Sequence, residues 1–437
     1  MQIMKYLILI GLMSLMIVTT LTRCDDDDDD GPPLDKPVLD PALVEQGKEI
    51  FRFDAFGDEG FWTDVLHMDK AILGEANGGF GSGVSPATAL SVGLKVDAEA
   101  LPASLVTSIN AGEVDLNDPA TTASLLQLDA VVGLKGSFDT DGKLNAVGIT
   151  CALCHSTVDD SFAPGIGKRL DGWANRDLNV GAIISLTDNA QPIADLLNVD
   201  EATLRTVLAA WGPGKYDAVL FLDGKALRPD GTIKPNLIPS AYGMQGIELT
   251  TYTGWGDVSY WNNMVAVNEM HGMGNFSDPR INDAVKYPVA TENGLYNVTV
   301  SNDLVTPKLP ALREYQLSLD PPVPPEGSYD KASADLGKAL FNGKANCATC
   351  HKAPIFADNV LHTPEEMGID DFESSRSPTG KYRTTPLRGL FARAKGGFYH
   401  DGRFPTLDDV VNHYNDHLQL GLTSTEKDNL VEYLKSI

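Results

Sequence analysis

The chain has 437 residues, of which 43% are hydrophobic, and a formal net charge of −26 at pH 7. This length predicts two or three domains with sizeable cores, because a single minimal domain is much shorter. So acidic a surface repels nucleic acid and favours a basic protein partner, which argues against a nucleic-acid-binding function.

The first predicted element is a signal peptide over residues 1–23. Its apolar run, residues 6–18, is too short to span a bilayer comfortably. Cys24 follows, and Leu21 fills the third position before it, as in a lipobox, although Arg23 departs from the usual small residue. We therefore expect Cys24 to be lipidated and to anchor an exported protein to a membrane. A plain signal peptide and an uncleaved anchor are the alternatives.

An acidic and proline-rich tether is predicted over residues 24–42. It opens with six consecutive aspartates at 25–30, a composition typical of a solvated, disordered segment. Lipoproteins of some Gram-negative bacteria carry an acidic run after the lipidated cysteine that sorts them to the outer membrane or cell surface, and this tract resembles one. We expect a periplasmic, outer-membrane or cell-surface location.

Folded sequence is expected from about residue 43. An amphipathic pattern predicts a helix at 43–51, and its G-K-x-x-F phrase recurs in a second predicted helix at 334–341. Between them the pattern predicts a helix at 199–211, glycine- and proline-rich loops at 212–214 and 235–239, and a proline-rich linker at 321–329. The last helix, 426–437, follows a capping box that starts at Thr423.

Four of the five cysteines stand in two Cys-x-x-Cys-His strings. In each string two thioethers would hold the edge of a porphyrin and the adjacent histidine would ligate its iron. A redox dithiol or a zinc site is the alternative, but zinc wants further ligands and no cysteine is spare. The sequence therefore predicts two covalent haem c groups, held by Cys151, Cys154 and His155 and by Cys347, Cys350 and His351.

The repeated helix phrase precedes both haem strings. At the second string the cysteines follow within six residues, the usual layout of a class I cytochrome c, whereas about a hundred residues intervene at the first. The expected fold is mainly α, with two class I cytochrome c-like modules at 43–320 and 330–437. A long insertion at 52–150 enlarges the first module.

Three phrases between residues 384 and 414 carry a resemblance: Thr385-Pro386-Leu387-Arg388, Tyr399-His400-Asp401-Gly402 and Thr406-Leu407. They resemble the T-P-x-L-R, aromatic-H-D-G and T-L-x-x-[VA] phrases of the bacterial di-haem cytochrome c peroxidase and MauG family. One departure is that no residue stands between Pro386 and Leu387. The resemblance is strong over 330–437 and weak over 43–320.

The resemblance implies a ligand for the second haem iron. Peroxidases of the family place a methionine about fourteen residues beyond the H-D-G histidine, and MauG places a tyrosine there. The corresponding residue is Tyr414, which we expect to bind the iron and lower its potential. His413, His417 and Met367 are the alternatives. His400 is expected to be a hydrogen-bonding residue beside the haem.

By the same resemblance the first haem is the reactive one, with a distal acid–base residue. The aromatic stretch 255–276 offers Glu269 and His271 for that role, although its residues are also explained as core. Arg176, just after the first haem string, is expected to pair with a haem propionate.

These expectations describe an oxidoreductase that uses hydrogen peroxide or oxygen at the first haem and passes electrons through the second, with a redox protein or small oxidant as partner. A non-enzymatic electron carrier with two six-coordinate irons is the main alternative. An oxygenase that cleaves a polymer is a third, because related rubber-cleaving proteins also have an enlarged first domain. Calcium binds between the domains of the peroxidases, so the resemblance allows calcium as a further cofactor.

Overall fold

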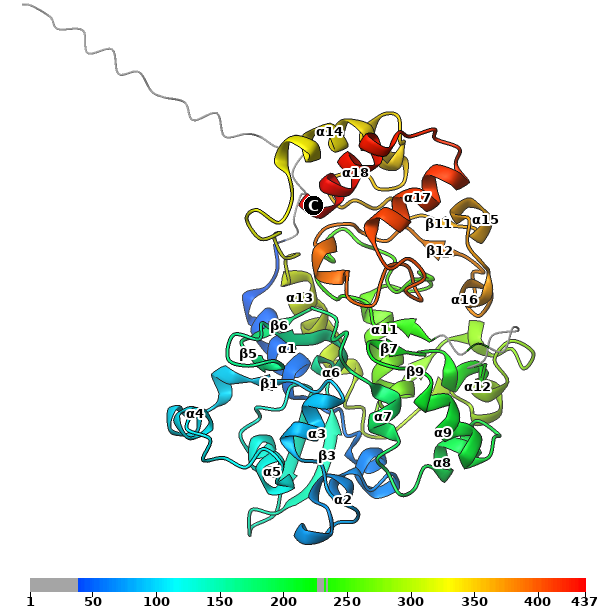
Figure 1. Ribbon diagram of the computed structural model, residues 1–437. Helices are drawn as coiled ribbons and strands as arrows, with labels where there is room; N and C mark the ends of the chain where they lie inside the picture. The colour runs from blue at the N-terminus through cyan, green and yellow to red at the C-terminus, as the bar shows by residue number, and fades with distance from the viewer. Residues whose placement is uncertain (1–37, 226–231, 233–234) are drawn as a thin grey trace, which may run out of the picture.

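The computed structural model describes residues 38–225, 232 and 235–437 (Figure 1). The expected signal peptide, the lipidation site Cys24 and most of the tether lie outside these residues. The tether was expected to reach residue 42, but helix α1 already begins at Pro41, with Asp40 as its N-cap. None of the described helices is long and apolar enough to cross a membrane.

The fold is mainly helical, as expected, with 43% helix and little sheet. The first part of the chain contains α1 (Pro41–Phe53), α2 (Met68–Leu73), α3 (Pro86–Ser91), α4 (Ala103–Asn110), α5 (Pro119–Gln127), α6 (Ala152–His155), α7 (Val180–Ile184), α8 (Gln191–Leu196), α9 (Glu201–Ala209), α10 (Leu220–Asp223), α11 (Val258–Met264), α12 (Pro288–Asn293) and α13 (Leu309–Ser318). The last part contains α14 (Lys331–Asn342), α15 (Pro364–Met367), α16 (Phe372–Ser375), α17 (Leu407–His417) and α18 (Ser424–Ser436).

Within residues 38–225 and 235–437, the strands form two-stranded ladders only. The longest is the antiparallel hairpin of β2 (Leu134–Phe138) and β3 (Leu144–Ile149). The shorter strands are β1 (Val96–Asp97), β4 (Ser156–Val158), β5 (Ile166–Gly167), β6 (Arg169–Asp171), β7 (Lys215–Tyr216), β8 (Asn236–Leu237), β9 (Phe276–Ser277), β10 (Asn297–Val298), β11 (Leu361–His362) and β12 (Tyr382–Arg383).

Two long-range helix pairs organise the chain. Helix α1 packs on α13, and α14 packs on α18, although each pair is far apart in sequence (Figure 1). A glycine lies at both crossings: a Cβ on Gly47 would come 2.0 Å from the carbonyl oxygen of Ala311, and a Cβ on Gly337 would come 2.0 Å from that of Asn429. The recurring G-K-x-x-F phrase therefore marks the same kind of close helix contact twice.

Three clusters of buried apolar side chains make up the core. One contains side chains of α2, α5 and the β2–β3 hairpin together with side chains of α7, α8 and α9. A second surrounds α1, α11 and α13, and a third lies among α14, α17 and α18. The two cytochrome c-like modules, the insertion and the domain limits remain predictions. The first cluster extends past residue 150, from the expected insertion into α7, α8 and α9.

Most of the expected elements are confirmed, with shifted ends. The helices expected at 43–51, 199–211, 334–341 and 426–437 are α1, α9, α14 and α18. The capping box is present, because Thr423 and Glu426 each accept a hydrogen bond from the other's backbone N–H. The loop expected at 235–239 is wrong in part, since Asn236–Leu237 pairs with Lys215–Tyr216 as a short ladder.

Candidate functional site

The first Cys-x-x-Cys-His string lines a large cavity, which we call the first cavity. It has an empty volume of about 1750 Å³, and Cys151, Cys154 and His155 all face it. The string forms the short helix α6, and Gly133 (φ +84°) packs directly beneath it. A Cβ on Gly133 would lie 2.1 Å from the Cα of Leu153, so only glycine allows this approach.

His155 is oriented as a haem ligand needs. Its Nδ1 lies 3.0 Å from the carbonyl oxygen of Pro239, to which a protonated Nδ1 donates a hydrogen bond. Burial lowers the pKa of His155 to about 4, so the ring is neutral and Nε2 keeps a lone pair. Proximal histidines are typically fixed in this way, through a hydrogen bond from the other ring nitrogen.

The second string lines a separate cavity, the second cavity, with an empty volume of about 1220 Å³. Cys347 and His351 face it, and apolar side chains from α14, α17 and α18 form most of its wall. The Nδ1 of His351 lies 3.1 Å from the carbonyl oxygen of Phe356, which repeats the arrangement of His155. Burial lowers the pKa of His351 as well.

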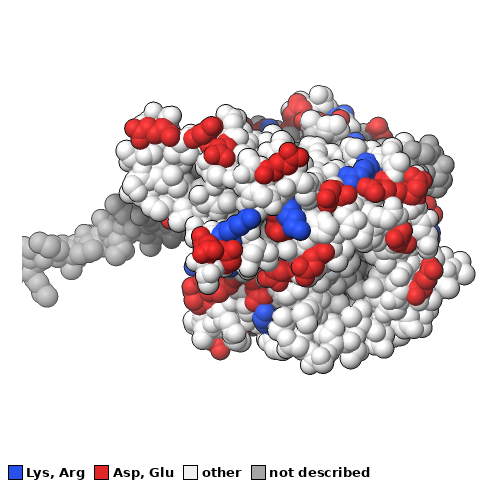
Figure 2. Space-filling model, turned by 90° about the horizontal axis from the view of Figure 1, so that it is seen from below, with Lys and Arg blue, Asp and Glu red and all other residues white. Residues whose placement is uncertain are grey.

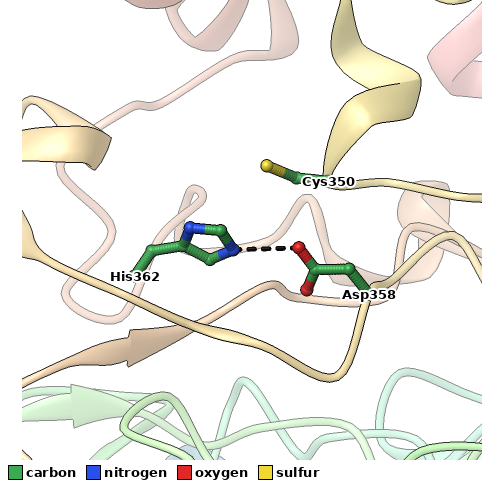
Figure 3. A group of neighbouring side chains, drawn as sticks. All are labelled: Cys350, Asp358 and His362. Carbon is green, nitrogen blue, oxygen red and sulfur yellow. Dashed lines mark hydrogen bonds and ion pairs between the residues drawn. The ribbon is translucent and has the colours of Figure 1, made fainter.

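Cys350 lies beside Asp358 and His362, and ligand atoms of the three residues fall within 4.8 Å of one another (Figure 3). His362 Nε2 and Asp358 Oδ2 are 2.9 Å apart. The sulfur of Cys350 is the one that the second Cys-x-x-Cys-His string would commit to a thioether. It is then not a thiolate, and two ligands remain, too few for a structural zinc site.

Tyr414 faces the second cavity from α17, and Met367 faces it from α15. Burial raises the pKa of the Tyr414 hydroxyl to about 12, and the neighbouring Tyr399 partly offsets that increase. His413 and His417 lie elsewhere: their Nε2 atoms are 2.9 and 3.2 Å from the carbonyl oxygens of Met367 and Glu366. Neither is among the cavity-lining residues, so Tyr414 and Met367 are better placed as iron ligands.

His400 is buried in the wall of the second cavity, where its ring stacks on Tyr382 with centroids 5.1 Å apart. Its own carbonyl accepts a hydrogen bond of 2.6 Å from the backbone N–H of Leu237, in β8. His400 thus connects the second cavity to a strand that also lines the first.

Five residues line both cavities and form a common wall between them: Arg176, Tyr252, Arg383, Thr385 and Arg393. Arg176 is buried, and its Nε and Nη1 have no hydrogen-bond partner among the residues that the structure describes. A close turn holds it, because a Cβ on Gly214 would lie 2.7 Å from its carbonyl oxygen. Burial and the charge of Arg393 lower the pKa of Arg383 to about 10.

Protonatable groups adjoin the first cavity. Tyr216 lines it and donates a 2.6 Å hydrogen bond to Oε2 of Glu269, which lies behind it. Burial raises the pKa of Glu269 well above its usual value. Glu269 sits at the end of a π-helical turn, Val265–Glu269, that continues α11, and such turns often occur at functional sites. Glu269 therefore reaches the first cavity through Tyr216.

His271 is placed differently from Glu269. Its ring stacks on Phe61 with centroids 3.7 Å apart and contacts Phe221 edge-on, and it is not among the residues that line the first cavity. Burial lowers its pKa to about 4, so the ring is neutral. Its distal role remains a prediction, without support from this position.

Glu373 lines the first cavity and belongs to a buried ionic cluster. Arg376 donates hydrogen bonds to Asp217, Asp223 and Glu373, and so joins the last part of the chain to the first. Burial raises the pKa of Glu373 to about 7, although Arg376 opposes the shift. One guanidinium faces three carboxylates here, so the cluster retains protons near neutral pH.

Sequence reasoning missed Tyr216, Glu373, Arg383, Arg393 and Tyr399. Arg383 precedes the Thr-Thr-Pro phrase and Tyr399 precedes His400, so their proximity to recognised motifs was a usable signal. Tyr216 and Glu373 stand in no motif. Only folding brings them beside the first haem string.

Several curated proteins are similar to parts of this chain. "Cytochrome-c peroxidase IdrP2" of Pseudomonas sp. (strain SCT) is 30% identical over 24% of this chain and 39% of its own length. "Methylamine utilization protein MauG" of Methylorubrum extorquens is 36% identical over 19% of this chain and 25% of its own length. "Cytochrome-c peroxidase IdrP1" of Denitromonas iodatirespirans is 28% identical over 24% and 40%.

These relatives are peroxidases and MauG. They support the resemblance to the di-haem cytochrome c peroxidase and MauG family, at low identity and over part of the chain. The chain spans at most 40% of the length of these three relatives. No family model matches it.

Two solved structures are similar over about half of the chain. The hydrazine synthase of Kuenenia stuttgartiensis, pressurised with xenon, aligns with a TM-score of 0.33 and 18% identity over 53% of this chain and 78% of its own. A MauG-like protein associated with microbial copper homeostasis aligns with a TM-score of 0.32 and 17% identity over 52% and 78%.

Proposed function

We propose that this protein is an exported di-haem c-type oxidoreductase of the peroxidase and MauG type. Peroxide or oxygen chemistry would take place at the first haem, and electrons would pass through the second. Glu373 carries the enzymatic part of the proposal, because it is a buried carboxyl group on the wall of the first cavity with a pKa of about 7. Acid–base catalysts work best with a pKa near the operating pH.

The residues present suit two covalent haems. Each cavity is lined largely by apolar side chains, presents cysteine sulfur, and holds a histidine whose Nδ1 faces a backbone carbonyl. When bound, haem supplies an iron that exchanges single electrons and, if a coordination position stays open, binds peroxide or oxygen. His155 and His351 would hold the two irons, and Cys151, Cys154, Cys347 and Cys350 would hold the porphyrin edges.

An open position on the first iron is part of the proposal, and it requires that Met244 and Met270, which also line the first cavity, do not ligate the iron. His155 is the one histidine among its lining residues. Asn262 and Gln316 also line this cavity, and the side-chain amide of Asn262 donates a 2.6 Å hydrogen bond to that of Gln316. Glu373 would donate and recover a proton at the cavity wall, and Tyr216 with Glu269 offers a second hydrogen-bonded pair for moving one. Arg376 keeps Glu373 in place through their hydrogen bond.

The second site would serve electron transfer. Tyr414 would ligate its iron, and the apolar side chains of α17 and α18 exclude water from its surroundings. An anionic tyrosine ligand stabilises ferric iron, so this haem would have a low reduction potential. The two cavities share five wall residues, so haems bound in both would lie near each other and offer electrons a short route.

Partner and location follow from charge and from the N-terminal sequence. Acidic side chains are spread over the face shown in Figure 2, with few basic ones among them. A basic redox protein would therefore be attracted to it. Lipidation at Cys24 would hold the protein at a membrane outside the cytoplasm. Cys24→Ser should then release the protein from membranes with both haems intact, and a variant that stays bound would contradict the anchor.

The proposed function is tested by the pH dependence of peroxide reduction by the reduced holoprotein. The acid form of Glu373 is present below pH 7 and is lost as the pH rises through about 7. We expect the rate of peroxide reduction to fall as the pH rises through this range, and Glu373→Gln to remove the inflection from the pH profile. Glu326→Gln, in the exposed linker, is the control.

Two outcomes would contradict the proposal in different ways. An unchanged inflection in the pH profile of Glu373→Gln would show that this residue does not transfer the proton. A wild-type protein that does not react with peroxide or oxygen, yet exchanges electrons with a basic redox protein, would be an electron carrier.

A further inference from the structure

Three arginines meet in the wall between the two cavities. Arg176 comes from the loop between β6 and α7, Arg383 from β12, and Arg393 from the segment after Thr385. The antiparallel pairing of β12 with β11 sets Arg383 opposite Leu361. Segments far apart in the sequence thus bring three guanidinium groups to one place.

None of the three has a carboxylate partner among the described residues. Arg383 donates to the carbonyl oxygens of Thr251 and Leu249. Arg393 donates to the hydroxyl of Tyr242 and to the carbonyl oxygens of Pro386 and Arg388. Arg176 is 8% exposed, and its Nε and Nη1 donate to no group in the described part of the chain.

Arg176 is buried, and Arg383 and Arg393 are half-buried. Positive charges so removed from water are costly unless an anion compensates them. Uncharged carbonyl groups satisfy guanidinium hydrogens but do not cancel their charge. Negative charge that reaches the wall from within the cavities would therefore stabilise all three arginines. Guanidinium groups bind carboxylates through paired, charge-assisted hydrogen bonds.

We infer that Arg176, Arg383 and Arg393 form one anion-binding wall that receives propionate carboxylates from the haems on both sides. This inference rests on the proposed two-haem function. It extends the expected role of Arg176 to two further residues and to both haems. The unpartnered Nε and Nη1 of Arg176 mark the position of a carboxylate that both sites can supply.

The same wall is a poor site for calcium, which prefers carboxylate and carbonyl oxygens. Among the described residues, no Asp or Glu lines the second cavity, and Glu373 alone lines the first. Glu373 is held by Arg376, and Arg393 donates to the carbonyl oxygen of Pro386. Guanidinium groups therefore supply the positive charge in this wall, and calcium elsewhere between the domains stays a prediction.

Spectroscopic redox titration of the purified holoprotein tests the inference. Positive charge beside a haem favours its reduced state, so removing it should lower the midpoint potential. We expect Arg383→Gln and Arg393→Gln each to lower the potentials of both haems. A shift of about tenfold in each one-electron equilibrium corresponds to about 59 mV. Arg383→Lys, which keeps the charge, should stay close to wild type.

Arg388→Gln is the matched control, because Arg388 belongs to the same segment but lines neither of the two cavities. Its two potentials should move much less. A change confined to one haem, or no change in either, would overturn the shared wall.

Haem content, measured as pyridine haemochrome on the same samples, separates this inference from the proposed function. A wild-type protein with fewer than two haems contradicts the proposed function itself. Two haems whose potentials ignore the arginines contradict the shared wall alone.

Discussion

Phe51 and Tyr315 pack edge to face, with ring centroids 5.4 Å apart, where α1 crosses α13. Phe341 and Tyr433 repeat this contact at 5.2 Å, where α14 crosses α18. In both pairs the phenylalanine stands four residues after the glycine of the crossing. Each haem-binding string lies in the chain between the two helices of such a pair, and this shared order supports the predicted duplicated module.

The helix crossings should tolerate no added methyl group. In Gly337→Ala the new Cβ would meet the Asn429 carbonyl oxygen at 2.0 Å, so the helices must separate. We expect thermal unfolding of the holoprotein to show a free energy of unfolding that is lower by about 1–3 kcal/mol or more, as for overpacked cores. Gly60→Ala, whose Cβ meets nothing within 4 Å, should be nearly neutral. Equal stability of both variants would refute the close crossing.

The Arg376 cluster should be essential for joining the two parts of the chain. Arg376→Met leaves Asp217, Asp223 and Glu373 buried without their cation. Removing one partner from a buried ion pair costs about 3–5 kcal/mol. Denaturant unfolding should show a decrease of that order in the free energy of unfolding.

The control for this loss is Lys435→Met, which removes a more exposed pair with Glu432. Pairs of that kind contribute about 0–1 kcal/mol. If Arg376→Met were no more destabilising than this control, the cluster would not hold the parts together.

Tyr414 is expected to ligate the second haem iron. Tyr414→Met should raise the potential of that haem, because the anionic ligand is lost, and Tyr414→Phe should leave an open or water-bound position. Ferric absorption spectra and potentiometry of the two variants measure this. Met367→Leu serves as the comparison, since Met367 faces the same cavity. Wild-type spectra and potentials in both Tyr414 variants, with a change in Met367→Leu, would assign the ligand to Met367.

The sequence predicted those helices whose formation depends on residues close together in the chain. The spacing of apolar residues and the Thr423 capping box predicted α18, and the G-K-x-x-F phrases predicted α1 and α14. The H-D-G phrase also indicated that His400 and Tyr414 belong to the second haem site, and both residues line the second cavity.

The rest depends on contacts between distant segments. Tyr216 stands more than 150 residues before both Glu373 and Arg376, and no spacing rule connects it to them. His271 shows the opposite error. Its residue type suggested distal chemistry, but the fold stacks it on Phe61, outside the cavity lining. Burial and partners, rather than residue type, decide such roles.

The electron paramagnetic resonance spectrum of the ferric holoprotein tests the central claim most directly. An open position on the first iron predicts a high-spin signal beside the low-spin signal of a six-coordinate second haem. Added hydrogen peroxide should remove the high-spin signal, while the control without peroxide keeps it. Two low-spin signals alone, unchanged by peroxide, would contradict the account, because neither iron would then be open to a substrate.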